Sequence, residues 1–271
     1  MTELTIVIVS YNTRADLEAC LRSLTESSPG VPHEIVVVDN GSADGSAEAA
    51  RCFKGVQVID AGANLGFARA NNVGIRGSDS ELVLLLNSDT LVPPGAIDAL
   101  VQDLRAHPDV GIVGPRIVDG NGRPEISFGR MIGPINELRQ KVVGRLYAHG
   151  NRVLTRWVER RVHEEHYPDW VSGACLLVRR AVAEVVGLLD ERYFIYMEDV
   201  DFCAAVRAAG MKVRFTPKAQ IVHYRGRAVA TNRQVVNLAY RRAHIAFYEK
   251  HHKRWAPLLK LYLALTGSRR G

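Results

Sequence analysis

The chain has 271 residues, of which 47% are hydrophobic and 24% charged, a composition that excludes a disordered or fibrous protein. Its length fits one large α/β domain or two small ones, and its 35 Lys and Arg against 29 Asp and Glu give a modest formal charge of +6. No apolar run reaches the roughly 20 residues that span a bilayer.

Strand-like and helix-like segments alternate through the first half of the chain. The segments Leu4–Val9, Glu34–Val38 and Leu82–Leu86 are rich in Val, Ile and Leu, as in buried strands, and Val56–Ile59 is a further predicted strand. A helix is expected after each of the first three strands in chain order. The first begins at Thr13-x-x-Asp16, which resembles a capping box, the second at the NGSADGS stretch, and the third covers Phe67–Ile75. The alternation predicts βαβ units and a mostly parallel sheet flanked by helices.

The second half of the chain is less regular, and residues 120–168 form a basic, poorly patterned insert. We expect strands at Gly111–Val118 and Val171–Val178, a helix at Asp199–Ala209, short strands at Val213–Phe215 and Ile221–His223, and a helical tail from about Asn232. No linker marks two independent domains.

Polar clusters follow the predicted strands where the chain leaves the sheet. They are Ser10-Tyr11-Asn12, Asp39-Asn40-Gly41-Ser42, Asn64-Leu65-Gly66-Phe67 and Asn87-Ser88-Asp89. Turns and helix caps use the same residue types, so any single cluster has an ordinary structural explanation. Four clusters on one edge favour a ligand site, because open parallel sheets bind ligands outside the carboxyl ends of their strands.

Three familiar kinds of site are excluded by the residues themselves. The position of a dinucleotide-binding G-x-G-x-x-G reads SYNTRA, the chain has no Gly-Lys dipeptide for a P-loop, and no G-x-S-x-G nucleophile elbow occurs. A diphosphate bound at this edge would therefore need a divalent cation, which prefers oxygen ligands. Asp89, at the end of the most apolar strand, is the natural candidate.

Three carboxylates, Glu198, Asp199 and Asp201, fall within four residues at the start of a predicted helix. One interpretation is structural, with Asp199 as the N-cap and the others as acids favoured by the helix dipole. The other is catalytic, because neighbouring acids in the partly apolar setting of Tyr193-Phe194-x-Tyr196 raise one another's pKa, which tunes a general base. His223, at a strand end beside arginines, is either a structural histidine or a metal or diphosphate contact.

Taken together, these residues resemble family 2 of the glycosyltransferases, which have the GT-A fold, and within it the bacterial rhamnosyltransferase-like members. The resemblance runs from Leu4 to about Gly226. The motifs that carry it are VSYN, VDNGS, NLGF at Asn64–Phe67, NSD in place of DxD, WVSGACLLVRR, MEDVDFC and HYRG.

The resemblance implies a role for each of these motifs. The residues implied in nucleotide-sugar binding are Ser10, Tyr11, Asn12, Asp39, Asn64, Gly66, Arg69, Asn87, Ser88 and Asp89. Asp89 would ligate Mg²⁺ or Mn²⁺, with His223 as a second protein ligand, although Asn87 replaces the first acid of DxD. Asp199 would be the catalytic base, with Glu198 and Asp201 positioning the substrate or a loop.

The resemblance also implies an activity and a division of the chain. It implies inverting, metal-dependent transfer of a sugar, with L-rhamnose from dTDP-L-rhamnose as the best guess, to a saccharide or polyprenyl-diphosphate-linked acceptor in cell-surface polysaccharide synthesis. The alternatives are a UDP- or GDP-sugar donor, a nucleotidyltransferase, and a non-catalytic nucleotide-sugar-binding module; nucleic acid is not expected as a partner. Residues 1–230 would form the GT-A domain, with a nucleotide-sugar half at 1–118 and an acceptor half at 119–230, and residues 231–271 a helical extension.

Basic residues gather at Arg123–Arg161 and Arg241–Arg254, as a solvated face or as a surface that attracts phosphates. Trp255, Leu258, Leu259, Leu261, Tyr262 and Leu265, flanked by Lys253, Arg254, Lys260 and Arg269, suit a helix on an anionic membrane; a homodimer contact or docking on the core explains the same pattern. Four separated cysteines and the absence of a signal peptide predict a cytoplasmic protein, with the inner face of the membrane as an alternative location.

Overall fold

The computed structural model describes residues 2–139, 152–224 and 233–267. Their largest element is one nine-stranded sheet with the order β3-β2-β1-β4-β10-β6-β11-β5, to which β7 adds beside β6. The strands are β1 Leu4–Ser10, β2 His33–Asp39, β3 Val56–Asp60, β4 Leu82–Asn87, β5 Thr90–Leu91, β6 Val110–Val118, β7 Pro124–Glu125, β10 Cys175–Arg179 and β11 Lys212–His223. A second, two-stranded sheet pairs β8 (Phe128–Gly129) with β9 (Trp170–Val171).

The sheet is mostly parallel. Strand β1 runs parallel to β2 and β4, β2 to β3, and β6 to β11. Strand β10 runs antiparallel between β4 and β6, so that a strand from the second half of the chain completes the sheet of the first half. This arrangement confirms the predicted α/β class.

Helices cover both faces of the sheet. They are α1 Arg14–Glu26, α2 Ser46–Arg51, α3 Phe67–Arg76, α4 Ala96–Ala106, α6 Arg152–Arg161, α7 Arg180–Val185, α8 Glu198–Ala208, α9 Arg233–His251 and α10 Ala256–Gly267. Ile6 and Ile8 of β1 pack with residues of α1 and α4, whereas Val7 and Val9 pack on the opposite face with residues of α3 and α8. The alternation follows from the two-residue period of a strand.

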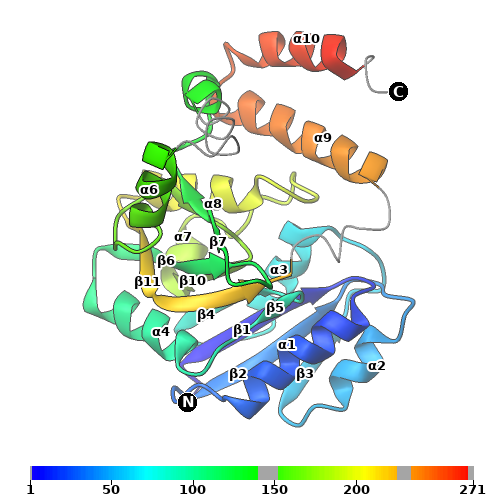
Figure 1. Ribbon diagram of the computed structural model, residues 1–271. Helices are drawn as coiled ribbons and strands as arrows, with labels where there is room; N and C mark the ends of the chain where they lie inside the picture. Colours follow the sequence, from blue (N-terminus) through cyan, green and yellow to red (C-terminus); the bar gives the residue numbers. More distant parts are fainter. Residues whose placement is uncertain (1, 140–151, 225–232, 268–271) are drawn as a thin grey trace.

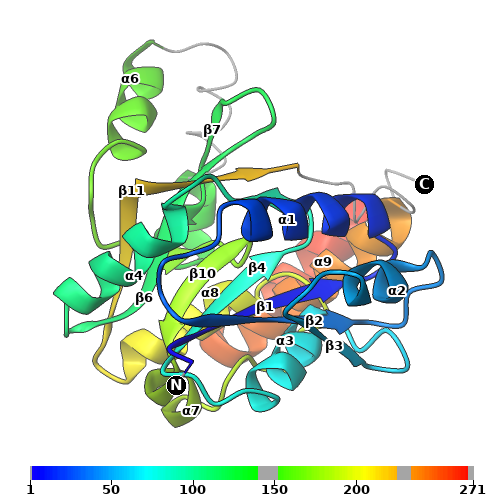
Figure 2. The same cartoon turned by 90° about the horizontal axis from the view of Figure 1, so that it is seen from below.

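The C-terminal helices form a further layer over α8. Tyr193 and Val200 pack with Phe247 and Tyr248 of α9 and with Ala256 of α10 in a third apolar cluster. Figure 1 shows this stack, with α8, α9 and α10 following one another away from the sheet, and Figure 2 shows α1 on the opposite face. Among the described residues, every helix is too short or too polar to cross a bilayer.

Several predicted boundaries were wrong. The strand predicted at Val171–Val178 is interrupted at residues 172–174, which separate β9 from β10, and the two short strands after Val213 are one strand, β11, with an irregularity between Thr216 and Gln220. The insert at 120–168 contains β7, β8 and α6. Its residues 140–151 lie outside the described part, as do Asn232, Arg225–Gly226 of HYRG and Arg269.

Of the two predicted helix caps, Thr13 occupies the N-cap position without its hydrogen bond, and Asp199 is not the N-cap. Thr13 precedes α1, but its hydroxyl makes no capping hydrogen bond, because it bonds to two serines at the strand ends instead. The residue that precedes α8 is Met197, so Asp199 lies inside the first turn and is not the N-cap.

Candidate active site

The ends of β1, β2 and β4 meet through hydroxyl contacts. Ser10 is paired with Asp39 in the register of β1 and β2. The Thr13 hydroxyl lies 3.0 Å from the Ser10 Oγ and 3.0 Å from the Ser88 Oγ, which links the end of β1 to the turn after β4. Ser10 and Ser88 are therefore buried supports of the strand edge. Thr13, which the sequence indicated only as a cap, joins them.

Asp39 and the residues after β1 border the same edge. One carboxylate oxygen of buried Asp39 accepts a hydrogen bond from the Ser42 backbone N–H at 3.0 Å, while its other oxygen has no hydrogen-bond partner among the described residues. Asn12 adopts a left-handed backbone (φ 53°), and its own N–H donates to the Ser42 hydroxyl. Tyr11 is exposed. A buried acceptor without a partner beside an exposed aromatic ring suits a ligand that donates hydrogen bonds and stacks.

The Asn64–Phe67 segment joins the strand edge to the loop before α8. The Asn40 amide donates to Asn64 Oδ1 at 3.0 Å, and the Phe67 backbone N–H donates to the Phe194 carbonyl at 2.6 Å. Gly66 has a φ of +83°, and a Cβ there would lie 2.5 Å from the Phe194 carbonyl oxygen. Only glycine satisfies both conditions, so Gly66 allows this close approach.

Arg69 lies away from these contacts. Its guanidinium is exposed on α3 and forms an ion pair with Glu191, 3.7 Å between Arg69 Nε and Glu191 Oε2. Arg76, on the same helix, pairs with the same glutamate at 3.1 Å. The structure therefore joins Arg69 to the loop before α8, and no described contact joins it to the strand-end cluster.

Asp89 and His223 come together, although 134 positions separate them in the chain. His223 Nε2 lies 3.1 Å from Asp89 Oδ1 and 3.5 Å from the Asn87 amide nitrogen. On the other side of the ring, Nδ1 lies 3.6 Å from Glu125 Oε2. Burial disfavours the charged imidazole, but the carboxylates of Asp89 and Glu125 outweigh it and raise the pKa of His223 to about 9.

Glu125 is a site residue that the sequence analysis missed. It lies in β7, which pairs antiparallel with the end of β6 and brings Glu125 opposite Ile117. The Asp119-Gly-Asn-Gly-Arg123 stretch between the two strands is a turn signal that could have predicted this hairpin. The sequence analysis did not identify Glu125 because it lies in the basic insert, which has no recognisable motif.

The donor atoms around Asp89 fit a divalent cation. Among the described residues, no group of three or more His, Cys, Asp and Glu side chains is arranged to hold a metal ion. Asp89 and His223 nevertheless offer a carboxylate and an imidazole side by side, and within the same part of the chain the buried Asn87 Oδ1 has no hydrogen-bond partner. This small set suits a cation such as Mg²⁺ or Mn²⁺ that takes its other ligands from phosphate oxygens and water, and His223 would have to lose its proton to bind it.

Glu198 and Asp199 are directed to the strand edge by an unusual turn. Tyr196 and Met197, immediately before α8, both have left-handed backbones, with φ of 72° and 68°. For residues other than glycine this conformation costs about 1–2 kcal/mol each and is concentrated at functional sites. As a result, the Gly173 backbone N–H donates to Asp199 Oδ2 at 2.9 Å.

The same segment ties Asp199 to the end of β4. Gly173 is followed by Ala174, whose carbonyl accepts the Asn87 backbone N–H at 3.0 Å. The break between β9 and β10 therefore places Asp199 near the residues around Asp89. Asp199 is therefore connected through Gly173, Ala174 and Asn87 to the His223–Asp89 pair, and all three side chains lie at one edge of the sheet.

The pKa values of both acids at the start of α8, Glu198 and Asp199, are raised. Burial, and then the adjacent Asp199 carboxylate, raise the pKa of Glu198 well above its usual range, and the Glu198 Oε2 has no hydrogen-bond partner in the described part of the chain. Burial also raises the pKa of Asp199, an effect that the N–H groups of Gly173 and Val200 partly offset. Asp199 is half-buried, less so than Glu198, and its second oxygen, Oδ1, accepts the Val200 backbone N–H at 2.8 Å.

Asp201 lies on a different side of α8. Its buried carboxylate is 2.7 Å from Lys250 Nζ and 2.6 Å from His251 Nε2, and it accepts the Tyr193 hydroxyl at 3.2 Å. Lys250 and His251 belong to the end of α9. Asp201 therefore attaches the C-terminal helices to α8, next to the turn that carries Glu198 and Asp199.

A comparison of the sequence with models of protein families shows the family of the chain. The model of the family named Glycosyl transferase family 2 matches residues 5–185, which is about two thirds of the chain. The chain belongs to glycosyl transferase family 2. It is a glycosyltransferase, and the expected resemblance to rhamnosyltransferase-like members is confirmed by its relatives.

Two relatives cover most of the chain. The N-acetylglucosaminyl-diphospho-decaprenol L-rhamnosyltransferase of Mycobacterium tuberculosis (strain ATCC 25618 / H37Rv) is 32% identical over 270 residues, which cover 94% of this chain and 87% of that protein. Rhamnosyltransferase WbbL of Escherichia coli (strain K12) is 22% identical over 243 residues, which cover 87% and 88%.

Solved structures confirm the GT-A fold. Mannosyltransferase PcManGT from Pyrobaculum calidifontis, in complex with GDP-Man and Mn²⁺, matches with a TM-score of 0.58 and 18% identity over 99% of this chain and 76% of that chain. GalNAc-T7 with UDP, GalNAc and Mn²⁺ matches with a TM-score of 0.61 and 16% identity over 83% and 44%. At these identities the likeness concerns the fold.

Proposed function

We propose that this glycosyltransferase moves L-rhamnose from dTDP-L-rhamnose to a hydroxyl of a lipid-linked saccharide in cell-surface polysaccharide synthesis, with inversion at the anomeric carbon and with Mg²⁺ or Mn²⁺ bound. The observation that carries the sugar and the acceptor class is the 32% identity, over nearly the whole chain, to a relative named as an L-rhamnosyltransferase acting on a diphospho-decaprenol-linked sugar.

The first half of the domain, residues 1–118, would hold the nucleotide. The exposed Tyr11 ring offers a stacking surface for the base, and the Asp39 oxygen that lacks a partner among the described residues can accept a ribose hydroxyl. Ser10, Thr13 and Ser88 keep the three strand ends in place, and Asn64 fixes the segment that approaches Phe194. These contacts support a preformed donor site.

Asp89, His223 and the Asn87 amide oxygen would hold the cation beside the diphosphate. A divalent cation bound there supplies Lewis-acid stabilisation for the charge that grows on the leaving diphosphate. Glu125, on the far side of the His223 ring, orients the imidazole, as carboxylates commonly do for metal-binding histidines.

Asp199 would act as the general base on the acceptor side, in the half formed by residues 119–230. Its raised pKa increases its affinity for the proton of the acceptor hydroxyl, and the backbone N–H groups of Gly173 and Val200 hold its two oxygens in a fixed orientation. Removal of that proton lets the acceptor oxygen displace the diphosphate directly. One displacement inverts the anomeric configuration and needs no covalent intermediate.

The experiment that tests the proposal is a panel of nucleotide sugars. Purified protein is incubated with dTDP-L-rhamnose and with UDP-, GDP- and other dTDP-sugars, each with Mn²⁺, Mg²⁺ or EDTA, and with a polyprenyl-diphosphate-linked N-acetylglucosamine acceptor. We expect acceptor-dependent release of dTDP from dTDP-L-rhamnose and an inverted linkage in the product by NMR. Turnover of a different donor would refute the rhamnose assignment, and full activity in EDTA would refute metal dependence.

A further inference from the structure

The last helix, α10, has apolar residues on two faces, and the described residues cover only one of them. Ala256 is buried against α9, and Leu259 packs at the edge of the same cluster. Along the other face, side chains at helical spacing are each about half exposed or more; we call this set the α10 apolar face, and it consists of Trp255, Leu258, Leu261, Tyr262 and Leu265. A continuous exposed apolar stripe of this kind is uncommon on a monomer and marks a contact surface.

The same region of the chain is strongly basic. Residues 233–271 contain nine Lys and Arg and a single acid, Glu249, whereas the rest of the chain contains 26 Lys and Arg and 28 Asp and Glu. Residues 233–271 are therefore strongly basic, as is the Arg123–Arg161 segment, and the remainder of the chain is not. A partner that binds this surface should be anionic and should offer an apolar layer as well.

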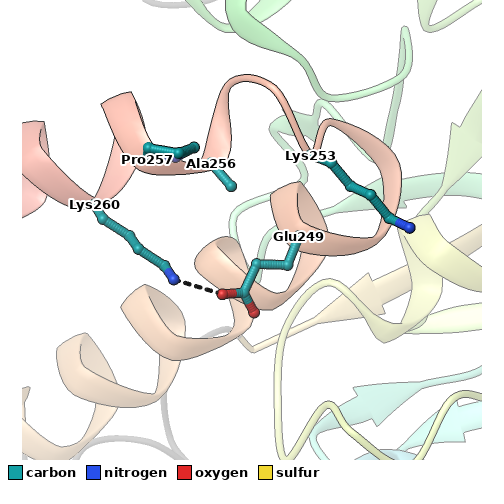
Figure 3. Close-up of a pocket in the computed structure, with 5 residues that line it drawn as sticks. All are labelled: Glu249, Lys253, Ala256, Pro257 and Lys260. Atoms are coloured by element: carbon teal, nitrogen blue, oxygen red, sulfur yellow. Dashed lines mark ion pairs between the residues drawn. The ribbon is translucent and has the colours of Figure 1, made fainter.

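The single acid does not neutralise the basic residues near the exposed face. Glu249 pairs with Lys260 at 2.6 Å across the junction of α9 and α10, in a shallow pocket that Lys253, Ala256 and Pro257 also line. Figure 3 shows this pair, with the Lys253 amine pointing away from it. Within the described part of the chain, Lys253 and Arg254 have no ion-pair partner, and both side chains are exposed directly before the α10 apolar face.

We propose that the α10 apolar face binds the surface of an anionic lipid bilayer, with α10 lying in the plane of the membrane. The Leu side chains would enter the acyl boundary, Trp255 and Tyr262 would sit at the headgroup level, and Lys253 and Arg254 would contact lipid phosphates. With 12 residues, α10 extends only about 18 Å, so it can lie on a bilayer but cannot cross it.

The position of α10 is compatible with this orientation. It is the outermost of the helices stacked above α8 in Figure 1. The ion pair between Lys250 and Asp201 ties the stack to α8, whose first turn carries Asp199. A bilayer on α10 would therefore lie on the same side of the sheet as the proposed base. The inference goes beyond the proposed function and holds for any donor sugar.

Vesicle co-sedimentation tests the inference. Full-length protein is mixed with vesicles of phosphatidylcholine alone or of equal parts phosphatidylcholine and phosphatidylglycerol, at low and high salt. We expect binding to the anionic vesicles only, weakened by salt. Leu261→Asp should lower the partition coefficient at least about tenfold, and the double variant Lys253→Gln/Arg254→Gln roughly fivefold for each charge removed.

Matched variants elsewhere on the surface control for charge and fold. Val185→Asp changes an apolar side chain on α7 that is 80% exposed, and Arg51→Gln/Lys54→Gln removes two basic residues near α2; neither should change vesicle binding. Thermal melting verifies that each variant is folded. No binding by wild type, or equal loss in the control variants, would overturn the proposal.

Two further measurements distinguish membrane binding from self-association and from a loss of catalysis. Sedimentation velocity shows whether the wild type is a dimer and whether Leu261→Asp dissociates it. Such a dimer, together with an absence of vesicle binding by the wild type, would overturn the membrane assignment. Turnover with a short, water-soluble acceptor does not require a bilayer, so Leu261→Asp should keep wild-type activity in that assay. Failure of vesicle binding with intact turnover would reject this inference alone, whereas absence of turnover in every variant would reject the proposed function.

Discussion

At the scale of single residues, the two acids that begin α8 have different surroundings and should respond differently to substitution. Asp199 is half-buried and has both oxygens held by the backbone N–H groups of Gly173 and Val200, whereas Glu198 is buried with an oxygen that lacks a partner among the described residues. A group that works on a substrate needs access and orientation. Asp199 has both, so we expect it to be the residue on which turnover depends.

Asp199→Asn should lower kcat by about 10²–10⁴-fold, the range typical of a lost general base, and leave the affinity for the nucleotide sugar unchanged. Because burial raises the pKa of Asp199, the wild-type rate should rise with pH through an apparent pKa above the usual aspartate value, and the variant should lack this limb. Steady-state kinetics and calorimetry with the donor measure both. Asp79→Asn, at an exposed position, serves as the control, and wild-type turnover in Asp199→Asn would remove the assignment.

Glu198→Gln should stabilise the protein above acidic pH. The pKa of Glu198 is raised in the folded state, so as pH rises the unfolded chain loses the Glu198 proton before the folded protein does. The free energy of unfolding of the wild type therefore falls between the ordinary pKa of glutamate and the raised pKa of Glu198. A neutral amide does not have this penalty. The melting temperature of the variant should match wild type near pH 4 and exceed it by a few degrees near pH 8. A constant difference at all pH values, or the same gain in the exposed Glu184→Gln, would contradict this reasoning.

Glu125→Gln should weaken metal binding while leaving the fold intact. The amide keeps the shape of the side chain but not the charge that faces His223 Nδ1 at 3.6 Å. Loss of such a supporting carboxylate commonly costs 10–100-fold in metal affinity, and we expect that range for Mn²⁺ titrated into the protein with a nucleoside diphosphate. Glu184→Gln is again a suitable control. Unchanged Mn²⁺ affinity would show that Glu125 does not position the histidine.

At the scale of helices and strands, the attachment of α9 depends on a few polar contacts. Lys250 Nζ bridges Asp190 at 2.8 Å and Asp201 at 2.7 Å. Lys250→Ala should lower the free energy of unfolding by about 1–2 kcal/mol, because the substitution leaves the buried Asp201 carboxylate with fewer hydrogen-bond donors. The partial exposure of the Lys250 side chain limits the loss. Lys253→Ala, nearby and exposed, should stay within about 0.5 kcal/mol. Denaturant unfolding measures the difference, and equal midpoints for the two variants would be the contrary result.

The sequence predicted those elements whose signal is local. Segments rich in Val, Ile and Leu predicted the first four strands, and the polar residues that follow them predicted most of the strand-end cluster, including Asp89. The interval between Val171 and Cys175 was predicted as part of one strand because apolar residues lie on both sides of it. Its interruption appears only when Gly173 meets Asp199, a contact across 26 positions. Glu125 was missed for the same reason, since its significance depends on His223.

At the scale of the whole molecule, the site is assembled from both halves of the chain. Strand β10 lies between β4 and β6, so residues 1–118 and the residues that follow them share one sheet, and Asp89 and His223 come from distant parts of the chain. A site built in this way offers few protein ligands to a cation. The cation and the diphosphate should therefore each supply ligands that the other needs, and their binding should be cooperative.

Removal of either ligand tests this coupling on the intact protein. Mn²⁺ alone and dTDP in EDTA should each change the melting temperature little, whereas the two together should raise it by more than the sum of the separate shifts. When the concentration of the bound ligand is a hundred times its dissociation constant, the gain in the free energy of unfolding should approach about 2.7 kcal/mol. The monophosphate dTMP lacks the second phosphate and should show a much smaller joint effect. Asp89→Asn should lose the joint effect but keep the small shift with dTDP in EDTA. If dTDP stabilised the wild type equally with Mn²⁺ and with EDTA, the donor would bind through protein groups alone, and the assignment of Asp89 and His223 to a cation would be wrong.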